Sequence, residues 1–387
     1  ALFIRGLSGM VRFTSIIFIS MTLMINLETT DFRVANAEEP PEFSQALPGY
    51  TYQFPRDFYS HDDFRIEWWY YTGNLEEVGT PRSYGYQLTF FRVALDTMGD
   101  NPNPSKWKVG HIYFAHMTLT DVEDEKFYYF ERINRKGIGN AGADSKRLMV
   151  WNEDWSLEGK DGKYLLEAVE SGTGIKLQLV PEKKLVIHGQ DGISKKGSEA
   201  GNASHYFSYT RMKTSGTIFV DGKSYKVFGT SWMDHEYSSN QLNNELSGWD
   251  WFSLKLDDQT ELMLYQLRRK SGGIDSFSSG TFVSSDGVSR HIKRDEFTVE
   301  SSAQWMSKQS GITYPAGWKL SLPGLGIKLS LSPDLNDQEL YNLRSISASY
   351  WEGSVSVEGT IRGDLIKGKG YVELVGYGKA LMQDLPE

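Results

Sequence analysis

The sequence predicts an almost entirely β-sheet protein. Many short segments of the 387-residue chain resemble strands, and no segment repeats its apolar residues with the 3.6-residue period of a long helix. Asp-Gly dipeptides, typical of tight hairpins, occur at 161–162, 191–192, 221–222 and 286–287. Aromatic residues make up 13% of the chain, and such residues favour pleated strands and line ligand cavities.

The amino terminus, residues 1–37, is predicted to be an export signal. Two arginines precede an apolar run at 15–27, and the run ANA at 35–37 fits a small-x-small cleavage pattern. The apolar run is short for a membrane span, and an uncleaved anchor is the alternative interpretation. A polar, extended leader is expected over 38–49. The predicted location of the protein is therefore the periplasm or the outside of the cell.

Two β-domains are predicted after the leader, at 50–215 and 216–387. The strand-like segments of the first domain are 67–75, 83–93, 111–120, 128–132, 164–168, 175–179, 185–188 and 206–211. The strand-like segments of the second domain are 216–220, 225–228, 251–256, 261–267, 280–283, 296–300, 318–321, 326–332, 354–359 and 370–377.

An internal repeat supports two related domains. The run WWYYTGNLEE at 68–77 aligns without gaps on WDWFSLKLDD at 249–258, and each run leads through a turn to YQL, at 86–88 and 265–267. Duplication explains the shared order of these features better than chance. If each sheet closes into a barrel, its edges disappear and its interior is able to hold a ligand.

The composition excludes several classes of function. A formal net charge of −9 argues against a nucleic-acid partner. The absence of Cys excludes disulfides, thiol catalysis and thiolate metal sites. No His pair has helical spacing beside a Glu, and no Asp-rich run has calcium-loop spacing, so we expect no metal and no cofactor. Ligands scattered along the chain would escape this argument. The chain also lacks the Gly-x-Ser-x-Gly nucleophile motif.

The run WMDHEY at 232–237 holds the predicted catalytic residues Asp234, His235 and Glu236. His235 is the side chain best suited to titrate near neutrality, and a neighbouring carboxylate orients it or acts as a second acid. On a regular strand, however, Asp234 and Glu236 face one side and His235 faces the other, so one cavity would not receive both kinds of group unless the strand were bulged. The alternative is a hydrogen-bond network with a structural role.

A ligand pocket of aromatic and polar side chains is expected around these groups. Its predicted members are Glu67, Trp69, Tyr71, His116, Trp232, Tyr237, Trp249, Trp251 and Tyr265. Packing in a core is the alternative for the tryptophans, and a hydrogen-bonded core position is the alternative for His116. Glu67 is either a cavity acid with a raised pKa or the partner of an arginine such as Arg92 or Arg268.

The sequence resembles the AttH/CrtC family in several runs taken together. These are WMDHEY at 232–237, EWWYYTG at 67–73, the strand of His116, YFSYTRM at 206–212, GWDWF at 248–252 and YWEG at 350–353. Many members are known as predicted secreted hydrolases, and the family includes the carotenoid hydratases, also called hydroxyneurosporene synthases. The resemblance covers the chain from about residue 50 to its end. It implies two lipocalin-like barrels of the calycin type and an apolar ligand, a lipid or an isoprenoid.

The chain differs from the hydratase members of that family. These resemble one another in a His-Asp-His-Asn-Trp run, whereas the matching run here is MDHEY at 233–237. They also carry Tyr-x-Asp, whereas Leu267 stands here at the position of that Asp. The chain is therefore closer to the AttH-like branch.

Three functions are compatible with these observations. The first is an exported enzyme of hydratase, isomerase or hydrolase type with acid–base chemistry on a lipid or isoprenoid, in transient contact with a membrane. The second is a non-catalytic periplasmic carrier or chaperone for such a molecule. The third is a structural partner of an envelope complex.

Overall fold

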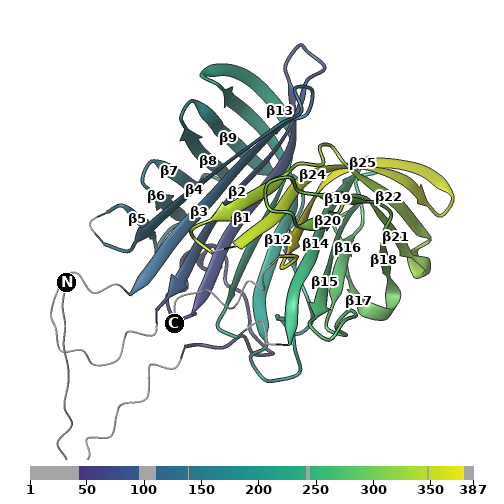
Figure 1. Cartoon of the computed structure of the whole chain (residues 1–387). Helices are drawn as coiled ribbons and strands as arrows, with labels where there is room; N and C mark the ends of the chain where they lie inside the picture. The colour runs from purple at the N-terminus through teal and green to yellow at the C-terminus, as the bar shows by residue number, and fades with distance from the viewer. Residues whose placement is uncertain (1–42, 96–109, 138, 241–244, 347, 379–387) are drawn as a thin grey trace, which may run out of the picture. The chain divides into compact units, whose positions relative to one another are not determined.

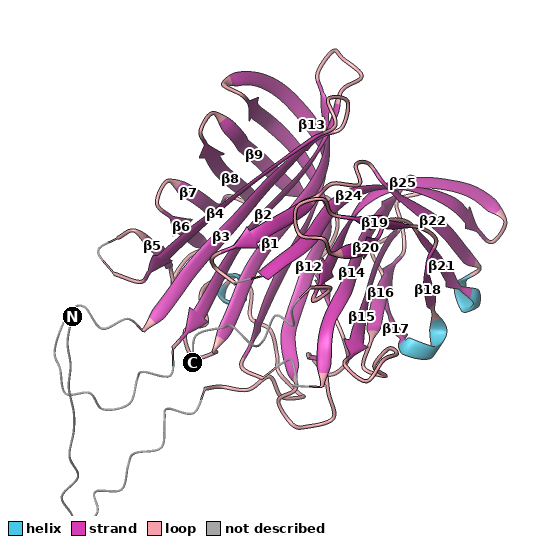
Figure 2. Cartoon of the chain, viewed as in Figure 1, coloured by secondary structure: helices cyan, strands magenta, loops and turns pink. Residues whose placement is uncertain are grey.

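The computed structural model describes residues 43–95, 110–137, 139–240, 245–346 and 348–378. Figure 2 shows that the regular structure in these ranges is almost all strand, which confirms the predicted fold class. The helical elements there are three short 3-10 turns: η1 (Arg56–Phe58), η2 (Arg294–Glu296) and η3 (Pro323–Leu325). Among the described residues, no helix has the length and hydropathy needed to cross a bilayer.

The predicted export signal, 1–37, lies outside the described residues, as does the start of the predicted leader, 38–42. Residues 43–49 of that leader form neither helix nor strand, in keeping with an extended segment.

The first sheet has 13 strands, and its main path runs β4-β3-β2-β1-β13-β12-β9-β8-β7-β6-β5. Its members are β1 (Ile66–Glu77), β2 (Ser83–Ala94), β3 (His111–Asp121), β4 (Lys126–Arg135), β5 (Ala141–Ala143), β6 (Met149–Asn152), β7 (Trp155–Lys160), β8 (Lys163–Glu170), β9 (Thr173–Pro181), β10 (Val186–Ile187), β11 (Ser194–Lys195), β12 (Ala203–Val220) and β13 (Lys223–Ser238). The predicted hairpin at Asp221-Gly222 joins β12 to β13, and both of its residues have positive φ, 49° and 80°.

The second sheet has 10 strands, and its main path runs β17-β16-β15-β14-β25-β24-β22-β21-β18. Its members are β14 (Leu246–Leu256), β15 (Glu261–Arg269), β16 (Ser279–Val283), β17 (Ser289–Lys293), β18 (Thr298–Ser301), β21 (Trp318–Leu322), β22 (Ile327–Pro333), β23 (Glu339–Leu343), β24 (Ala348–Ile361) and β25 (Asp364–Val375). A separate two-stranded sheet joins β19 (Gln304–Met306) to β20 (Thr313–Pro315).

The two sheets repeat one topology, which supports the predicted duplication. In each, four consecutive strands form one arm, β1 to β4 and β14 to β17, and the first of them pairs with the last strand of its sheet, β13 or β25. The aromatic runs of the repeat lie in β1 and β14, and the two YQL runs lie in β2 and β15. The YQL match does not extend to side-chain positions, because Tyr86 packs in the core of the first sheet whereas Tyr265 packs in the cluster of Trp251.

Side chains bring the two ends of the first sheet together into a nearly closed barrel. Asn134 on β4 donates from Nδ2 to Oδ1 of Asn152 on β6 at 2.7 Å, and Arg132 donates to the Asn152 carbonyl at 3.1 Å. The interior of the curved sheet is a continuous core that includes Trp155, Phe207 and Met233. The second sheet has its own core around Phe252 and Trp318.

The domain division predicted after residue 215 falls inside β12. Both β12 and β13 pair within the first sheet, so the chain passes from one sheet to the other between Ser238 and Leu246. Figure 1 shows β24 and β25 lying beside β1 and β2, where the two sheets contact each other.

Candidate functional site

The strand β13 runs straight through the predicted catalytic triplet and divides it. Because side chains alternate along a strand, Asp234 and Glu236 point to one side and His235 to the other. His235 packs against Trp69 and Phe207 in the interior of the first sheet, with ring centroids 5.1 and 5.0 Å apart. Asp234 instead lies on the face that meets the second sheet. The triplet is therefore not one site, as the alternation of a regular strand predicts.

On the interior side, His235 joins a histidine–carboxylate centre, which we define as His61, Glu67 and His235. Oε1 of Glu67 lies 2.8 Å from Nδ1 of His61 and 2.9 Å from Nε2 of His235. Oε2 of Glu67 accepts hydrogen bonds from the His61 backbone N–H at 2.9 Å and from Nε of Arg92 at 3.1 Å. All three members of the centre are buried, and Glu67 has no exposed surface. The predicted pairing of Glu67 with Arg92 is confirmed.

The pKa values of the centre follow from this arrangement. Burial acts to raise the pKa of Glu67, but the charge of His61 and the hydrogen bonds from both imidazoles outweigh it and lower that pKa. For His61, the charge of Glu67 and the hydrogen bonds to Asp57 and Glu67 overcome burial and raise the pKa. Burial lowers the pKa of His235. Glu67 is therefore ionised, and the interpretation of Glu67 as an acid with a raised pKa is wrong.

Asp234 has a different environment on the other side of β13. Its Oδ2 accepts a hydrogen bond from the Tyr206 hydroxyl at 2.7 Å, and its Oδ1 accepts one from Nε1 of Trp232 at 2.6 Å and one from the Ser208 hydroxyl. Trp251 of the second sheet donates from Nε1 to the Tyr206 hydroxyl at 3.1 Å. Burial raises the pKa of Asp234 to about 7, although these hydrogen bonds oppose the shift.

Two glutamates of the second sheet complete an inter-sheet acid cluster, which we define as Asp234, Glu352 and Glu373. Glu352 on β24 lies directly opposite Glu373 on β25, and Glu373 lies opposite Trp251 on β14. Tyr70 of the first sheet donates from its hydroxyl to Oε1 of Glu352 at 2.7 Å, and Trp249 donates from Nε1 to Oε2 of Glu373 at 2.7 Å. Oε2 of Glu352 is buried without a hydrogen-bond partner among the described residues.

Three carboxyl groups so placed favour the protonated form. Burial, with added repulsion from Glu373 and Asp234, raises the pKa of Glu352 well above its usual range. Burial also raises the pKa of Glu373 to about 7, and the charges of Asp234 and Glu236 add to the shift. Burial and mutual repulsion therefore favour the neutral carboxylic acid form of Glu352, and they bring the pKa of Glu373 to about 7.

Glu236 lies beside this cluster but has a positively charged partner. Its Oε1 lies 3.4 Å from Nζ of Lys196 and accepts a hydrogen bond from the Ser204 hydroxyl. The Lys196 ammonium also lies 4.0 Å from the centroid of the Tyr265 ring. This pairing matches the structural role that was the alternative for the triplet.

The predicted pocket residues divide in the same way. Trp69, Tyr71 and Tyr237 belong to the interior core of the first sheet. Trp232, Trp251 and Tyr265 belong to the aromatic cluster around Asp234, and the partly buried Trp249 packs against it. His116 contacts the Tyr350 hydroxyl at 2.9 Å and the Ser345 hydroxyl at 2.8 Å, and burial lowers its pKa to about 4. For His116, the hydrogen-bonded core position is confirmed.

Sequence reasoning missed Glu352, Glu373 and His61 as site residues. Glu352 stands in the YWEG run that was used for the family resemblance, and Glu373 interrupts the otherwise apolar run YVELV at 371–375. A carboxyl group in an otherwise apolar strand is a feature from which a functional site can be predicted. His61 carries no comparable signal, because it lies in the polar run SHDD at 60–63.

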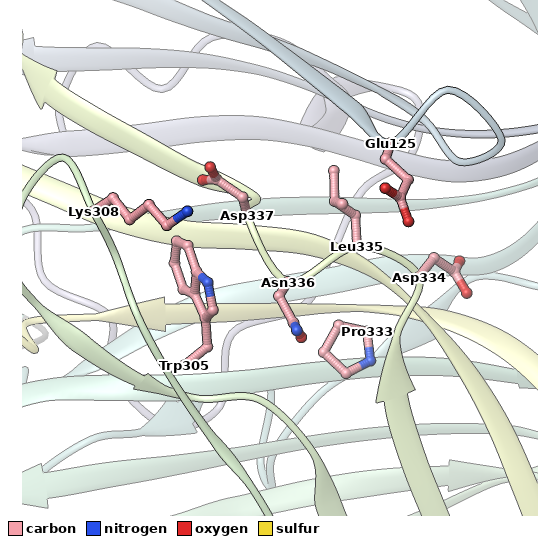
Figure 3. Close-up of a pocket in the computed structure, with 8 residues that line it drawn as sticks. All are labelled: Glu125, Trp305, Lys308, Pro333, Asp334, Leu335, Asn336 and Asp337. Carbon is pink, nitrogen blue, oxygen red and sulfur yellow. The ribbon is translucent and has the colours of Figure 1, made fainter.

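A surface pocket of about 360 Å³ lies apart from both sites (Figure 3). It lies between the β3–β4 turn, the strand β19 and the loop after β22, and its lining residues are Glu125, Trp305, Lys308, Pro333, Asp334, Leu335, Asn336 and Asp337. None of these is a predicted site residue.

Comparison with known proteins identifies a family and several relatives of this chain. Residues 45–377 match the family described as AttH-like. A crystal structure of an AttH protein from Nitrosomonas europaea is 32% identical, with a TM-score of 0.78 over 87% of this chain and 100% of that one. Kievitone hydratase from Fusarium solani subsp. phaseoli is 26% identical over 145 residues, which are 38% of this chain and 40% of that protein. The chain thus spans less than half of that curated relative.

The crystal structure of kievitone hydratase from Nectria haematococca shares the fold. Its TM-score is 0.64 over 88% of this chain and 97% of that one, at 16% identity.

Proposed function

Since the chain belongs to the AttH-like family, we propose that it is a hydratase-like enzyme that adds water to a carbon–carbon double bond of an apolar lipid or isoprenoid. The observation that carries the proposal is Glu352, a buried carboxyl group whose Oε2 has no hydrogen-bond partner among the described residues. A proton on that oxygen has no acceptor in the resting protein. A buried group left unsatisfied in this way calls for an explanation, and a waiting proton donor is one.

The surroundings of Glu352 suit this chemistry. Protonation of an alkene carbon by Glu352 uses the π electrons to form a C–H bond and leaves a carbocation. Tyr70 and Trp251 pack edge to face with their ring centroids 5.2 Å apart, and the ring face that this contact leaves uncovered stabilises a cation. Water then adds to the cation, and the ionised form of Glu373 accepts the released proton. Transfer of that proton back to Glu352 restores the enzyme, so the net reaction is alkene plus water giving alcohol.

The test is to incubate the purified protein with apolar alkenes from bacterial lipid extracts in ¹⁸O-labelled water. We expect products that carry one added water with the label, and we expect the Glu352→Gln variant to lose about 10²–10⁴-fold in rate. Glu358→Gln is the matched control, because Glu358 lies on the same strand and is exposed. Equal turnover by wild type and Glu352→Gln would contradict the assignment of the acid.

A non-catalytic carrier of the same apolar molecules is the second candidate. It is favoured by the aromatic cluster packed between the sheets and by the absence of the Tyr-x-Asp carboxylate at Leu267. In that case native mass spectrometry would show a retained lipid in both wild type and Glu352→Gln, and neither protein would form labelled alcohol.

Export to the periplasm is part of the proposal and depends on residues 1–37 alone. Amino-terminal sequencing of protein recovered from the periplasmic fraction tests it, and we expect the sequence to begin at Glu38. An intact residue 1 in that fraction would contradict cleavage.

A further inference from the structure

We propose that the histidine–carboxylate centre, His61, Glu67 and His235, binds one divalent transition-metal ion, and that zinc suits it best. This site lies on the opposite side of β13 from the inter-sheet acid cluster. The three residues come from distant parts of the sequence, so no spacing motif announces them. They are the scattered ligands that escape a search for helical His pairs.

The backbone brings three donor atoms to one point. Glu67 lies on β1, His235 lies on the neighbouring β13, and His61 precedes β1 by five residues. One ligand atom from each of His61, Glu67 and His235 lies within 4.8 Å of the other two, and Oε1 of Glu67 contacts Nδ1 of His61 and Nε2 of His235. All three side chains are buried, so the donors face one another and not the solvent.

The donor set is that of a known class of zinc site. Two imidazole nitrogens and one glutamate oxygen form the protein ligands of several catalytic zinc enzymes, with a fourth position left for water or a substrate. Ligand atoms in a tetrahedral zinc site lie about 3.3 Å apart, since each bond is about 2.0–2.1 Å long. The contacts of Glu67 with the two imidazoles are 2.8 and 2.9 Å, so Glu67 and each imidazole must move apart by about half an ångström to admit the ion.

Neighbouring groups hold the ligands in place, as outer residues do in metal sites. The Asp57 carboxylate lies 3.4 Å from Nε2 of His61, and the Tyr237 ring stacks on the His61 ring at 3.7 Å between centroids. Arg92 and the His61 backbone N–H hold Oε2 of Glu67, which leaves Oε1 for the ion. The positive charge of Arg92 repels a cation. Metal binding at this centre therefore requires that the attraction of the three ligands exceed this repulsion.

The competing account is a hydrogen-bonded hub in which Glu67 accepts from both imidazoles and no ion is present. The two accounts differ in metal content, in stability and in spectrum. A bound ion stabilises the folded state in proportion to its occupancy, whereas a hydrogen-bonded hub gains nothing from added metal. None of these readouts needs a substrate, so the result is independent of the hydratase proposal.

The experiment uses untagged protein, stripped with a chelator and then dialysed against Zn²⁺ or Co²⁺. We expect about one equivalent of metal by elemental mass spectrometry, a rise in Tm with Zn²⁺, and the intense visible absorption of tetrahedral Co²⁺. His235→Gln is expected to lose all three. His205→Gln is the matched control, because His205 is buried nearby, 4.9 Å from the Tyr237 ring centroid, but contributes no ligand.

Wild-type protein that takes up no metal and shows no change in Tm would overturn the proposal. The same conclusion follows if His235→Gln binds metal as well as wild type does. If His235→Gln fails to fold, the Tm shift and the Co²⁺ spectrum of the stripped wild-type protein decide the question without it.

Discussion

The two faces of β13 hold carboxyl groups with opposite proton affinities. On the interior face, Glu67 is surrounded by two imidazoles and the guanidinium of Arg92, and its pKa is lowered. On the face toward the second sheet, Asp234, Glu352 and Glu373 have aromatic and hydroxyl neighbours and one another, and their pKa values are raised. Both environments are buried. On these two faces of β13, the neighbouring positive charge, and not burial alone, separates the lowered pKa of Glu67 from the raised pKa of Asp234.

The largest effect expected from this contrast is on stability. Glu67→Gln leaves Arg92 buried without its anion, and we expect the free energy of unfolding to fall by about 3–5 kcal/mol. Glu352→Gln replaces a neutral acid by a neutral amide, and we expect a change within about 1 kcal/mol. Urea unfolding of both variants and wild type measures the difference. Similar losses for the two variants would remove the distinction between the faces.

The next effect is the pH dependence of stability caused by Glu373. Its pKa rises from 4.5 to about 7 in the folded protein, where it faces Trp249, Glu352, Asp234 and Glu236. Between these pH values the folded chain holds a proton that the unfolded chain has lost, so the free energy of unfolding falls as the pH rises.

Through this group, we expect the free energy of unfolding of the wild-type protein to be higher at pH 5 than at pH 8. In Glu373→Gln, we expect the free energy of unfolding to fall less between these two pH values. Urea titrations at both pH values provide the measurement, with Glu358→Gln as the exposed control. An unchanged decrease in Glu373→Gln would mean that Glu373 has an ordinary pKa.

The smallest effect concerns the hydrogen bond that joins the two sheets at the acid cluster. Trp251→Phe removes the indole donor from the Tyr206 hydroxyl while keeping an aromatic ring. We expect a loss of about 0.5–1.5 kcal/mol in the free energy of unfolding, with no change in the metal content of the histidine–carboxylate centre. If the variant lost metal as well, the two faces of β13 would be coupled and not separate.

Local patterns predicted much of this fold. The Asp-Gly pairs at 161–162 and 221–222 mark two-residue hairpins, and the strand-like segments at 67–75 and 83–93 correspond to β1 and β2. The alternation rule also predicted that Asp234 and His235 face opposite sides. The length of β13 was underestimated, because Gly229 and the small residues after it break the alternating pattern, although cross-strand pairing carries the strand on to Ser238.

The sites themselves depend on contacts between distant parts of the sequence. Tyr70 and Glu352 are 282 positions apart, and His235 and Glu67 are 168 positions apart. Periodicity along one strand shows which face a side chain occupies but not which strand of another sheet covers that face. For this reason Glu352, Glu373 and His61 were not predicted, while Glu67 was predicted as a site residue with its two alternatives open.

Infrared spectroscopy at neutral pH tests most directly whether the two faces of β13 differ in charge state. Protonated and ionised carboxyl groups absorb at different frequencies, so each variant reveals the state of the group that it lacks. The wild-type spectrum minus the Glu352→Gln spectrum is predicted to show a band of a protonated carboxylic acid. The wild-type spectrum minus the Glu67→Gln spectrum is predicted to show a carboxylate band. If Glu352→Gln removes a carboxylate band instead, Glu352 is an anion at neutral pH and cannot be the proton donor.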